Sequence, residues 1–458
     1  MRILIAGGGQ VGALIAGRLV REGNEVVIVE QDADRCQELE EQLDVKVVRG
    51  HAASVLALRE AGIADAEMLI AVTNVDEINL LACMVAQVES RARVKVARLR
   101  THEVELWRRV AERSGLKIDL IIHPETDVAR RIMRVMRLPG VSDVLEFAGG
   151  QARLFGMNVE PNSWLAGKTL EELDRAGPPK NSLIVLIFRG QQVIIPHGAE
   201  LLLPGDHIYT MATRDNLEDV LRFMGVERQE TLSRVFIIGG KQIGIGIAEM
   251  LEEQGVHVKL FEIDARRCEK IAAMLNKTIV IHGDGTDQTT LEEENISDVD
   301  AFLALTHDDE ANVIASLLAR RLGAKKVVAL INRLNYLHMV QRLGVNTTVS
   351  PRLAAVDRIL QFVRKARVLS VTTFREEEAE AIELIATEGK KYVGKKLRDI
   401  RFPRGAIVGA IARPSGEVIV PRGEATIQAR DRVIFFALES VVPELESAFL
   451  VEPTRESA

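Results

Sequence analysis

Residues 3–36 read ILIAGGGQVGALIAGRLVREGNEVVIVEQDADRC, an apolar run followed by a glycine-rich loop and a helical pattern. Gly7, Gly9 and Gly12 have the GxGxxG spacing, directly after a predicted strand and at the start of a predicted helix. The first glycine permits a tight turn, the second lets the backbone approach a pyrophosphate, and the third lets the helix pack closely on the strand. Free N–H groups at the start of the helix favour the same anion. The stretch therefore predicts a nucleotide-binding βαβ unit.

An acidic residue, Glu30, ends the second predicted strand at roughly the spacing of the dinucleotide fingerprint. A carboxylate there accepts hydrogen bonds from ribose hydroxyls and repels a 2′-phosphate. This favours NAD(H) or an adenine nucleotide over NADP(H). The alternative is a glycine turn kept for packing alone, with Glu30 at a solvated strand end.

The same pattern returns at a constant offset in residues 235–268, VFIIGGKQIGIGIAEMLEEQGVHVKLFEIDARRC. In this copy Lys241 replaces the middle glycine, while Glu262 keeps the position of Glu30. A side chain at position 241 obstructs the closest approach of a backbone to a pyrophosphate, although an ammonium group suits a phosphate. Two interpretations stay open for the second half: a nucleotide site, or a structural copy that holds no ligand.

A second repeat lies further along each half, because WLAGKTLEELD at Trp164 is similar to YVGKKLRDIRF at Tyr392. The chain is therefore two copies of a two-domain unit. Short Val/Ile/Leu runs alternate with helical patterns in each first domain, which predicts a doubly wound parallel sheet of the α/β class. The second domains have short strands, turns with Pro-Gly and Gly-Asp, and one short helix, at 170–175 or 397–400, which predicts a small α+β module. The predicted domains are residues 1–122, 143–226, 232–350 and 370–453.

Polar residues stand at the ends of later strands, where ligands of open α/β sheets bind. We expect Thr73 and Asn74 to contact a cofactor, and Arg98 to reach a phosphate or the nicotinamide ribose. For Arg98 a salt bridge within the protein is the alternative. The acidic clusters Asp76-Glu77 and Asp308-Asp309-Glu310 are expected to cap and charge the starts of the helices that follow.

The composition excludes several classes of protein. A formal net charge of −7 leaves no basic excess to neutralise phosphates, which argues against a nucleic-acid partner. The 3 cysteines have no metal-ligand spacing, and no catalytic triad or metal cluster is evident, so we expect neither an enzyme nor a metal site. No apolar run is long enough to cross a bilayer. We therefore expect a cytoplasmic protein that reaches a membrane only through a partner.

The glycine loops, the strand-end acids, the segment GHAASVLALREAGIADAEMLIAVTNVDEINLLA at residues 50–82 and the paired modules together resemble one family. The whole chain is similar to the TrkA family, the peripheral nucleotide-binding subunits of Trk potassium uptake systems, built from tandem RCK units. The resemblance implies two Rossmann-like domains, each followed by an RCK C-terminal module. It also implies NAD(H) as ligand and, in some members, ATP or ADP.

Carried over residue by residue, the family's nucleotide contacts fall in both halves of the chain. In the first half they are Gly7, Gly8, Gly9, Gln10, Val11, Gly12, Glu30, Thr73, Asn74 and Arg98. In the second half they are Gly239, Gly240, Lys241, Gln242, Ile243, Gly244 and Glu262. Lys241 departs from the glycine usual in the family, which leaves the second ligand open between ATP and NAD.

The resemblance further implies a regulator rather than an enzyme. Such proteins attach as a ring of copies, expected here to be a tetramer, to the cytoplasmic face of a Trk-type potassium-transporting membrane subunit. Two alternatives stay open: an RCK-type regulator of a different ion transporter, and an NAD-dependent oxidoreductase. Co-purification with a membrane subunit separates the first alternative from the main hypothesis, and turnover of nucleotide would identify the second.

Overall fold

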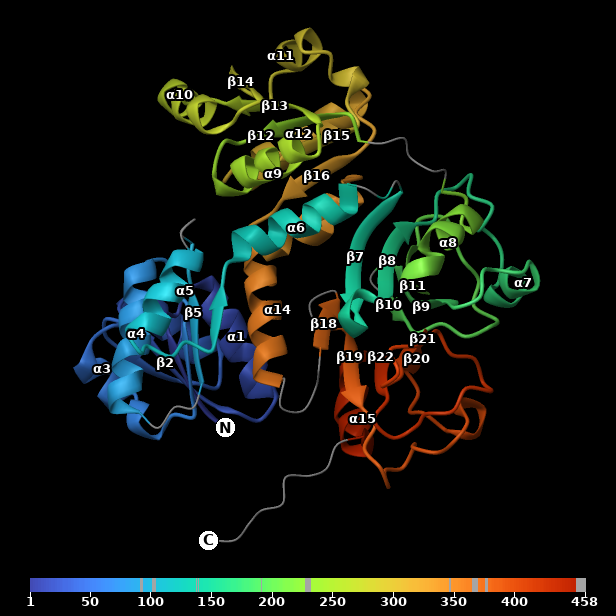
Figure 1. Ribbon diagram of the computed structural model, residues 1–458, viewed down its shortest axis with the longest axis horizontal. Coiled ribbons are helices and arrows are strands. Elements are labelled where there is room, and N and C mark those ends of the chain that lie inside the picture. Colours follow the sequence, from blue (N-terminus) through green and yellow to red (C-terminus); the bar gives the residue numbers. More distant parts are fainter. Residues whose placement is uncertain are drawn as a thin grey trace. The chain divides into compact units, whose positions relative to one another are not determined.

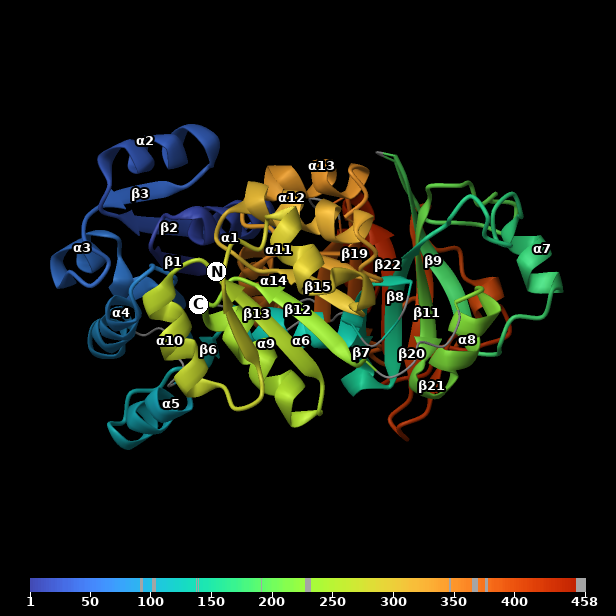
Figure 2. The ribbon, with the colours of Figure 1, turned by 90° about the horizontal axis from the view of Figure 1, so that it is seen from above.

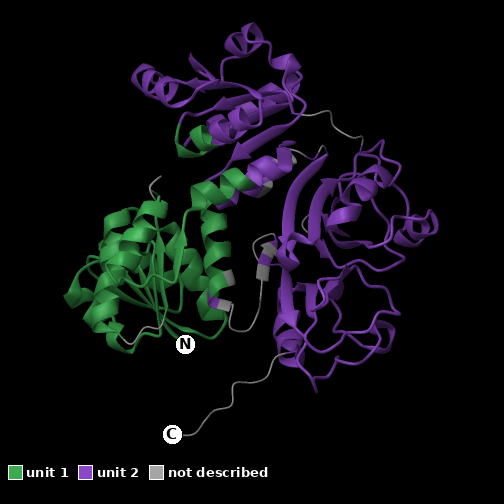
Figure 3. Cartoon of the chain, in the orientation of Figure 1, with its two compact units in different colours: residues 1–130, 241–246, 350–362 green, residues 131–240, 247–349, 363–458 purple. Residues whose placement is uncertain are grey.

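The computed structural model describes residues 1–90, 94–100, 104–136, 138, 140–190, 192–226, 232–345, 347–364, 370–374 and 378–449. Contacts divide the chain into two compact units (Figure 3). Unit 1 contains residues 1–130, 241–246 and 350–362, and unit 2 contains residues 131–240, 247–349 and 363–458. Unit 1 is therefore the first nucleotide domain with two short segments from the second half of the chain.

The first domain is a 6-stranded parallel sheet in the order β3-β2-β1-β4-β5-β6 (Figure 1). Its strands are β1 (Arg2–Ala6), β2 (Glu25–Glu30), β3 (Lys46–Arg49), β4 (Met68–Ala71), β5 (Val94–Arg98) and β6 (Leu120–Ile122). Its helices are α1 (Gln10–Arg21), α2 (Ala33–Gln42), α3 (Val55–Glu60), α4 (Asp76–Glu89), α5 (Val104–Arg113) and α6 (Pro124–Met136).

The successive residues Ile3 to Ala6 of β1 are all buried, so both faces of this sheet are covered. Leu4 and Ala6 pack in one core with Leu58 of α3 and Cys83 of α4. The strand order reverses between β1 and β4, and in open α/β sheets that crevice, outside the carboxyl ends of the strands, is where ligands bind. The predicted doubly wound sheet is confirmed, and its reversal point defines the edge on which the site is built.

The second nucleotide domain repeats this topology in the order β14-β13-β12-β15-β16-β17, with all strands parallel. Its strands are β12 (Arg234–Ile238), β13 (His257–Glu262), β14 (Ile279–His282), β15 (Ala301–Ala304), β16 (Val327–Leu330) and β17 (Thr347–Val349). Its helices are α9 (Gln242–Glu253), α10 (Ala265–Met274), α11 (Gln288–Glu293), α12 (Asp309–Arg321), α13 (Leu337–Arg342) and α14 (Pro351–Arg364). The internal duplication predicted from the sequence is therefore a duplication of the fold.

The two small modules are 5-stranded antiparallel sheets with few helices. The first module contains β7 (Val141–Phe147), β8 (Ala152–Asn158), β9 (Ser182–Arg189), β10 (Gln192–Ile194), β11 (His207–Thr213), α7 (Leu170–Arg175) and α8 (Leu217–Phe223). The second contains β18 (Ser370–Phe374), β19 (Ala379–Ile385), β20 (Ala406–Ala412), β21 (Val418–Ile419), β22 (Arg432–Leu438) and α15 (Val442–Phe449). The helix predicted at 170–175 is confirmed, whereas the one predicted at 397–400 is a short 3₁₀ turn, Leu397–Asp399.

Within unit 2 the two modules pack against each other (Figures 1 and 2). Phe147 of the first module and Phe436 of the second share one buried core, with ring centroids 6.2 Å apart in an edge-to-face arrangement. An ion pair of 2.7 Å between Arg422 and Asp174 also links the modules. The predicted domain limits stay a prediction, and the last of them, residue 453, lies outside the described residues.

Candidate functional site

The first glycine loop joins β1 to α1 as the fingerprint requires. Gly7 has a φ of 110°, and its N–H donates to the carbonyl oxygen of Val29 (2.9 Å). A Cβ on Gly12 would lie 2.0 Å from the carbonyl oxygen of Gly7, so any larger residue is excluded at the start of the helix. These two glycines are therefore required by the fold itself, for the turn and for close packing.

Gly9 is different, because among the described residues no atom other than those of its chain neighbours lies within 4 Å of the place a Cβ would occupy. It is the N-cap residue of α1 and has no side chain to cap the helix, and none of the described side chains is bonded to the first N–H groups of α1. The first turn of α1 therefore has N–H groups with no side-chain acceptor, next to open space. A helix N-terminus of this kind attracts anions. The residues present thus fit the pyrophosphate of a dinucleotide.

The Glu30 carboxylate, at the end of β2, faces this loop. Its Oε2 accepts a hydrogen bond from the N–H of Gly8 (2.7 Å), and its Oε1 accepts from Gln31 (2.7 Å) and Asp32 (3.0 Å). A carboxylate has about four acceptor positions, so capacity for a further donor remains. Glu30 therefore supports the loop and still offers an acceptor to a ribose hydroxyl.

An arginine that the sequence analysis did not single out also lies at the loop. Arg35, in the first turn of α2, donates from its Nε to the carbonyl oxygen of Gly8 (2.8 Å) and pairs with Glu38 (2.7 Å). Its counterpart Arg267 lies 3.8 Å from Glu262. The signal was present in the repeat, because both arginines stand one residue before the repeated cysteines.

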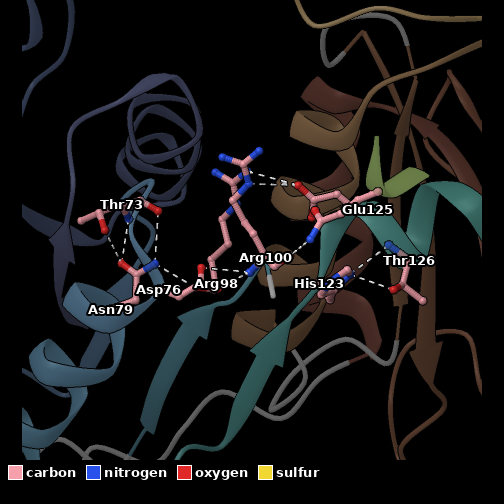
Figure 4. Close-up of polar contacts among 9 residues, drawn as sticks. Thr73, Asp76, Asn79, Arg98, Arg100, His123, Glu125 and Thr126 are labelled. Carbon is pink, nitrogen blue, oxygen red and sulfur yellow. Dashed lines mark hydrogen bonds and ion pairs between the residues drawn. The ribbon is translucent and has the colours of Figure 1, made fainter. Parts of the chain in front are cut away.

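The ends of β4 and β5 supply the other predicted contacts (Figure 4). The N–H and Oγ1 of Thr73 are both bound to the side chain of Asn79 (2.8 Å each), whereas Asn74 is exposed. The Arg98 side chain is 10% exposed, and its terminal nitrogen lies 4.0 Å from Glu125 Oε1. Burial lowers the pKa of the Arg98 guanidinium, and the nearby Glu125 opposes this shift.

Glu125, in the first turn of α6, completes this buried charged cluster and was missed by the sequence analysis. It also pairs with the Nε of Arg100 (3.2 Å). Within the described residues, Arg98 Nε and Glu125 Oε2 are buried without a hydrogen-bond partner. The salt bridge foreseen as the alternative for Arg98 is present but long, and it leaves one donor and one acceptor unused.

The helix acids charge the first turns of α4 and α12, and Asp308 caps α12, as predicted, but Asp76 and Asp309 also bind the loop after the neighbouring strand. Both carboxylate oxygens of Asp76 accept from the N–H of Arg100 (2.9 Å each), and Asp309 accepts in the same way from Asn332 and Arg333. These acids therefore hold the loop after the neighbouring strand instead of capping their own helices. Asp308, one residue earlier, is the cap of α12 and accepts from Ala311 (2.9 Å).

The second glycine loop has the same frame. Gly239 has a φ of 102°, and the N–H of Gly240 donates to Glu262 Oε2 (3.0 Å), as Gly8 does to Glu30. Ile243 and Gly244 are buried at the start of α9, as Val11 and Gly12 are in α1. The side chains of this loop differ from those of the first.

Gln242 shows that difference most directly, because its side-chain amide donates to the carbonyl oxygen of Arg100, within unit 1. The predicted ligand contact Gln242 is thus bound to the arginine loop of the first half. Gln10, its counterpart, is exposed at the start of α1.

The described residues contain neither a metal-binding cluster nor a helix that could span a bilayer. Groups of three or more His, Cys, Asp or Glu side chains placed to hold a metal ion do not occur among them. In the same part of the chain, no helix combines the length and the apolar character needed to span a bilayer.

Comparison with known proteins agrees with this architecture. The TrkA-N domain matches residues 3–124 and 235–351, and the TrkA-C domain matches residues 154–225 and 381–450. The Trk system potassium uptake protein TrkA of Halomonas elongata is 38% identical over 443 residues, 96% of either chain. That of Vibrio alginolyticus is 37% identical over 458 residues, 99% of either chain.

Solved structures show the same fold. The RCK domain of GsuK superposes with a TM-score of 0.61 at 20% identity, covering 98% of this chain and 94% of that one. The GsuK channel bound to NAD has a TM-score of 0.60 at 20% identity, covering 98% of this chain and 78% of that one. The similar proteins named here are potassium uptake proteins and parts of a channel, not enzymes. The identities and the tandem TrkA-N and TrkA-C domains establish that this chain belongs to the TrkA family.

Proposed function

We propose that this protein is a nucleotide-sensing regulatory subunit, which binds NAD(H) in its first half and controls potassium transport through a Trk-type membrane subunit. One observation carries the nucleotide part of the proposal: open space at Gly9, beside a helix N-terminus and the Glu30 carboxylate. The potassium part is supported by the relatives, which are named for potassium uptake.

The proposed first site has a distinct role for each group. Gly7, Gly8, Gly9, Gln10, Val11 and Gly12 surround the pyrophosphate, Glu30 accepts from the adenosine ribose, and Thr73, Asn74, Arg98 and Glu125 lie toward the other end of the ligand. A 2′-phosphate would meet the Glu30 carboxylate, so NADP(H) is disfavoured. The unused donor of Arg98 and acceptor of Glu125 suit a ribose hydroxyl at that end.

In this proposal the nucleotide acts as a ligand and undergoes no reaction. It shifts a conformational equilibrium if it binds one arrangement of the assembly more tightly than another. A coupling of about 1 to 3 kcal/mol changes the ratio of two states roughly 5- to 150-fold. We propose that the assembly is a ring of copies, a tetramer, on the cytoplasmic face of the membrane subunit.

For the second half we propose a nucleotide site with a different preference. Gly239, Gly240, Lys241, Gln242, Ile243, Gly244 and Glu262 form its loop and strand-end acid. Lys241 adds a positive charge where the first loop has Gly9, which favours a ligand with more phosphate charge, such as ATP or ADP. 

Calorimetric titration of the purified protein with NADH, NAD⁺, ATP, ADP and NADPH tests both sites. The Glu30→Ala and Glu262→Ala variants assign each binding event to a half, and both are expected to fold. We expect Glu30→Ala to weaken NAD(H) binding about ten-fold or more, as loss of a charged hydrogen-bond acceptor does. Unchanged affinity for NAD(H) in Glu30→Ala would contradict the proposed first site.

Two further readouts test the regulatory role. The protein should co-purify with a Trk-type membrane subunit, and NADH should change the potassium flux of that complex. Co-purification with another ion transporter instead would move the assignment to a different RCK-type regulator. Hydride transfer between the nucleotide and an added substrate would identify an oxidoreductase and overturn the proposal.

A further inference from the structure

A buried asparagine ties together the two strand ends of the first site. Asn79, in α4, has no exposed surface, and all its amide hydrogen-bonding capacity is used. Its Nδ2 donates to the carbonyl oxygens of Thr73 (3.1 Å) and Arg98 (2.8 Å). Its Oδ1 accepts from the N–H and the Oγ1 of Thr73 (2.8 Å each). Figure 4 shows this network beside the arginines.

The hydrogen bonds of Asn79 join β4 and β5 just beyond the last residues that the sheet ladder pairs. The pairing of β4 with β5 runs in register to Ala71 and Ala97, and beyond these residues no ladder joins the two strands. Asn79 takes over by bonding to Thr73 after β4 and to Arg98 at the end of β5. The backbone of Thr73 also lies under the glycine loop, because a Cβ on Gly7 would be 3.0 Å from its nitrogen. Asn79 therefore links the strand end that lies under the glycine loop to the strand end that carries the arginine.

The first turn of α4 holds the arginine segment at a second point. The Asp76 carboxylate accepts from the N–H of Arg100, and Asn79 donates to the carbonyl oxygen of Arg98. The main chain on both sides of Leu99 is thus fixed by one rigid helix. This matters for the Arg98 guanidinium, because its Nε is buried without a partner among the described residues. Besides its long ion pair with Glu125, the position of that side chain depends on where its main chain is held.

The second half contains an equivalent asparagine network, but the strand end that it holds carries a different residue. Asn312 donates to the carbonyl oxygens of Thr306 (3.0 Å) and Leu330 (2.8 Å) and accepts from the N–H and Oγ1 of Thr306. It has no exposed surface either. Leu330 stands where the first half has Arg98. The asparagine is therefore part of the fold in both halves, but only Asn79 holds a strand end that carries a charged side chain toward the ligand edge.

We propose that Asn79 is a positioning residue of the first nucleotide site, which places Arg98 for the ligand by holding its main chain; the proposal rests on the nucleotide site proposed above. Its role differs from that of Asn312, which supports the sheet edge without presenting a cation. The distinguishing property is energetic coupling between Asn79 and Arg98 in ligand binding, and a purely structural role would produce none.

The test is a double-mutant cycle on NADH affinity, measured by calorimetry on the full chain. Asn79→Asp keeps the size of the side chain and removes both donors. We expect it to weaken first-site binding about ten-fold, as loss of one well-placed hydrogen bond does. In the Arg98→Ala background the same substitution should weaken binding less than about two-fold, because the residue that it positions is gone. Asn312→Asp is the matched control and should leave first-site affinity unchanged.

Each outcome has a distinct meaning. A ten-fold loss in both backgrounds would show that Asn79 only supports the fold, and would overturn the proposal. Wild-type affinity in Asn79→Asp would do the same while leaving the proposed function intact. Absence of nucleotide binding in the wild-type protein would instead overturn the proposed function. If Asn79→Asp does not fold, Asn79→Ser is used in the same cycle, because its smaller polar side chain leaves room for water to bridge the same groups.

Discussion

The two nucleotide domains share their strand order, their glycine turn, their strand-end acid and their buried asparagine, yet they differ where a ligand would lie. The shared features all have partners inside the protein. Glu30 and Glu262 bind the N–H groups of their own glycine loops, and Asn79 and Asn312 close the same gap between strands. A repeated residue of this kind is explained by the fold before any ligand is considered.

The residues that differ are informative for the opposite reason. Gly9, where an added Cβ would meet no neighbouring atom of the described residues within 4 Å, becomes Lys241, and Arg98, with a buried donor and no acceptor for it among the described residues, becomes Leu330. Packing in the described residues does not require a glycine at position 9, and it leaves the Arg98 Nε without an acceptor. Functional information therefore lies in the differences between the halves more than in their common motif, and the strand-end acid alone is weak evidence for a ribose.

The largest effect should come from crowding the first loop. We expect Gly12→Ala to destabilise the first domain by about 3 kcal/mol or more, because its Cβ would lie 2.0 Å from the Gly7 carbonyl oxygen. Gly246→Ala, in α9 of the second half, meets no atom within 4 Å and should stabilise that helix by up to about 1 kcal/mol. Hydrogen exchange, resolved by domain, measures both changes. Equal stability of the two variants would show that the loop tolerates a side chain at position 12.

A carboxylate present only in the second half gives the next effect. Glu252, in α9, accepts from the N–H groups of Asn276 (3.1 Å), Lys277 (2.8 Å) and Thr278 (2.6 Å), and its counterpart in the first half is Val20. Burial alone would raise the pKa of Glu252, but the hydrogen bonds from residues 276–278 outweigh it and lower the pKa to about 2. Removing the charge by Glu252→Gln should cost about 1 to 2 kcal/mol at neutral pH.

The sign of the pH dependence follows from that shift. The folded pKa lies below the unfolded value of about 4.3, so the stabilisation is complete above that pH and is lost as the pH falls toward 2. Protection of the 276–278 amides relative to the rest of the second domain should therefore fall between about pH 4.3 and 2 in the wild type, and should be flat in Glu252→Gln. Glu253→Gln, an exposed neighbour, is the control. Loss of the acid transition in that control as well would assign the effect to overall charge.

Much of this architecture could be predicted from the sequence, because it depends on local patterns. Alternating apolar runs and helical segments predict the two parallel sheets, and the glycine spacing with Glu30 predicts the loop and its acid. Long-range contacts could not be predicted. Asn79 bonds to Arg98 and Asp76 to Arg100 across 19 and 24 residues, and an acid at the start of a helix looks like a cap whichever partner it takes. Glu125 gives no signal of its own, since its role depends on α6 lying against the arginines.

The smallest effect is expected from exchanging the two loop residues that differ between the halves, Gly9 and Lys241. This exchange tests the comparison of the two halves most directly. Gly9→Lys should fold, because the position faces open space, yet NADH affinity of the first half should fall about ten-fold, as a side chain would enter the space left for the pyrophosphate. Lys241→Gly should raise NADH binding at the second half and lower its preference for ATP. Gln42→Lys, at an exposed position at the end of α2 and outside the proposed site, controls for added charge.

The pair of variants separates two explanations of the difference between the halves. If Gly9→Lys loses NADH affinity and Lys241→Gly gains it, one residue sets which ligand each loop accepts. If Gly9→Lys loses affinity for NADH while Lys241→Gly gains none, removing the lysine side chain from the second loop is not sufficient for NADH binding. Leu330 in place of Arg98 would then be the reason, because opening the loop does not restore a cation at the far end of the ligand. Leu330→Arg combined with Lys241→Gly should in that case restore binding, which would make the arginine and the open glycine jointly necessary.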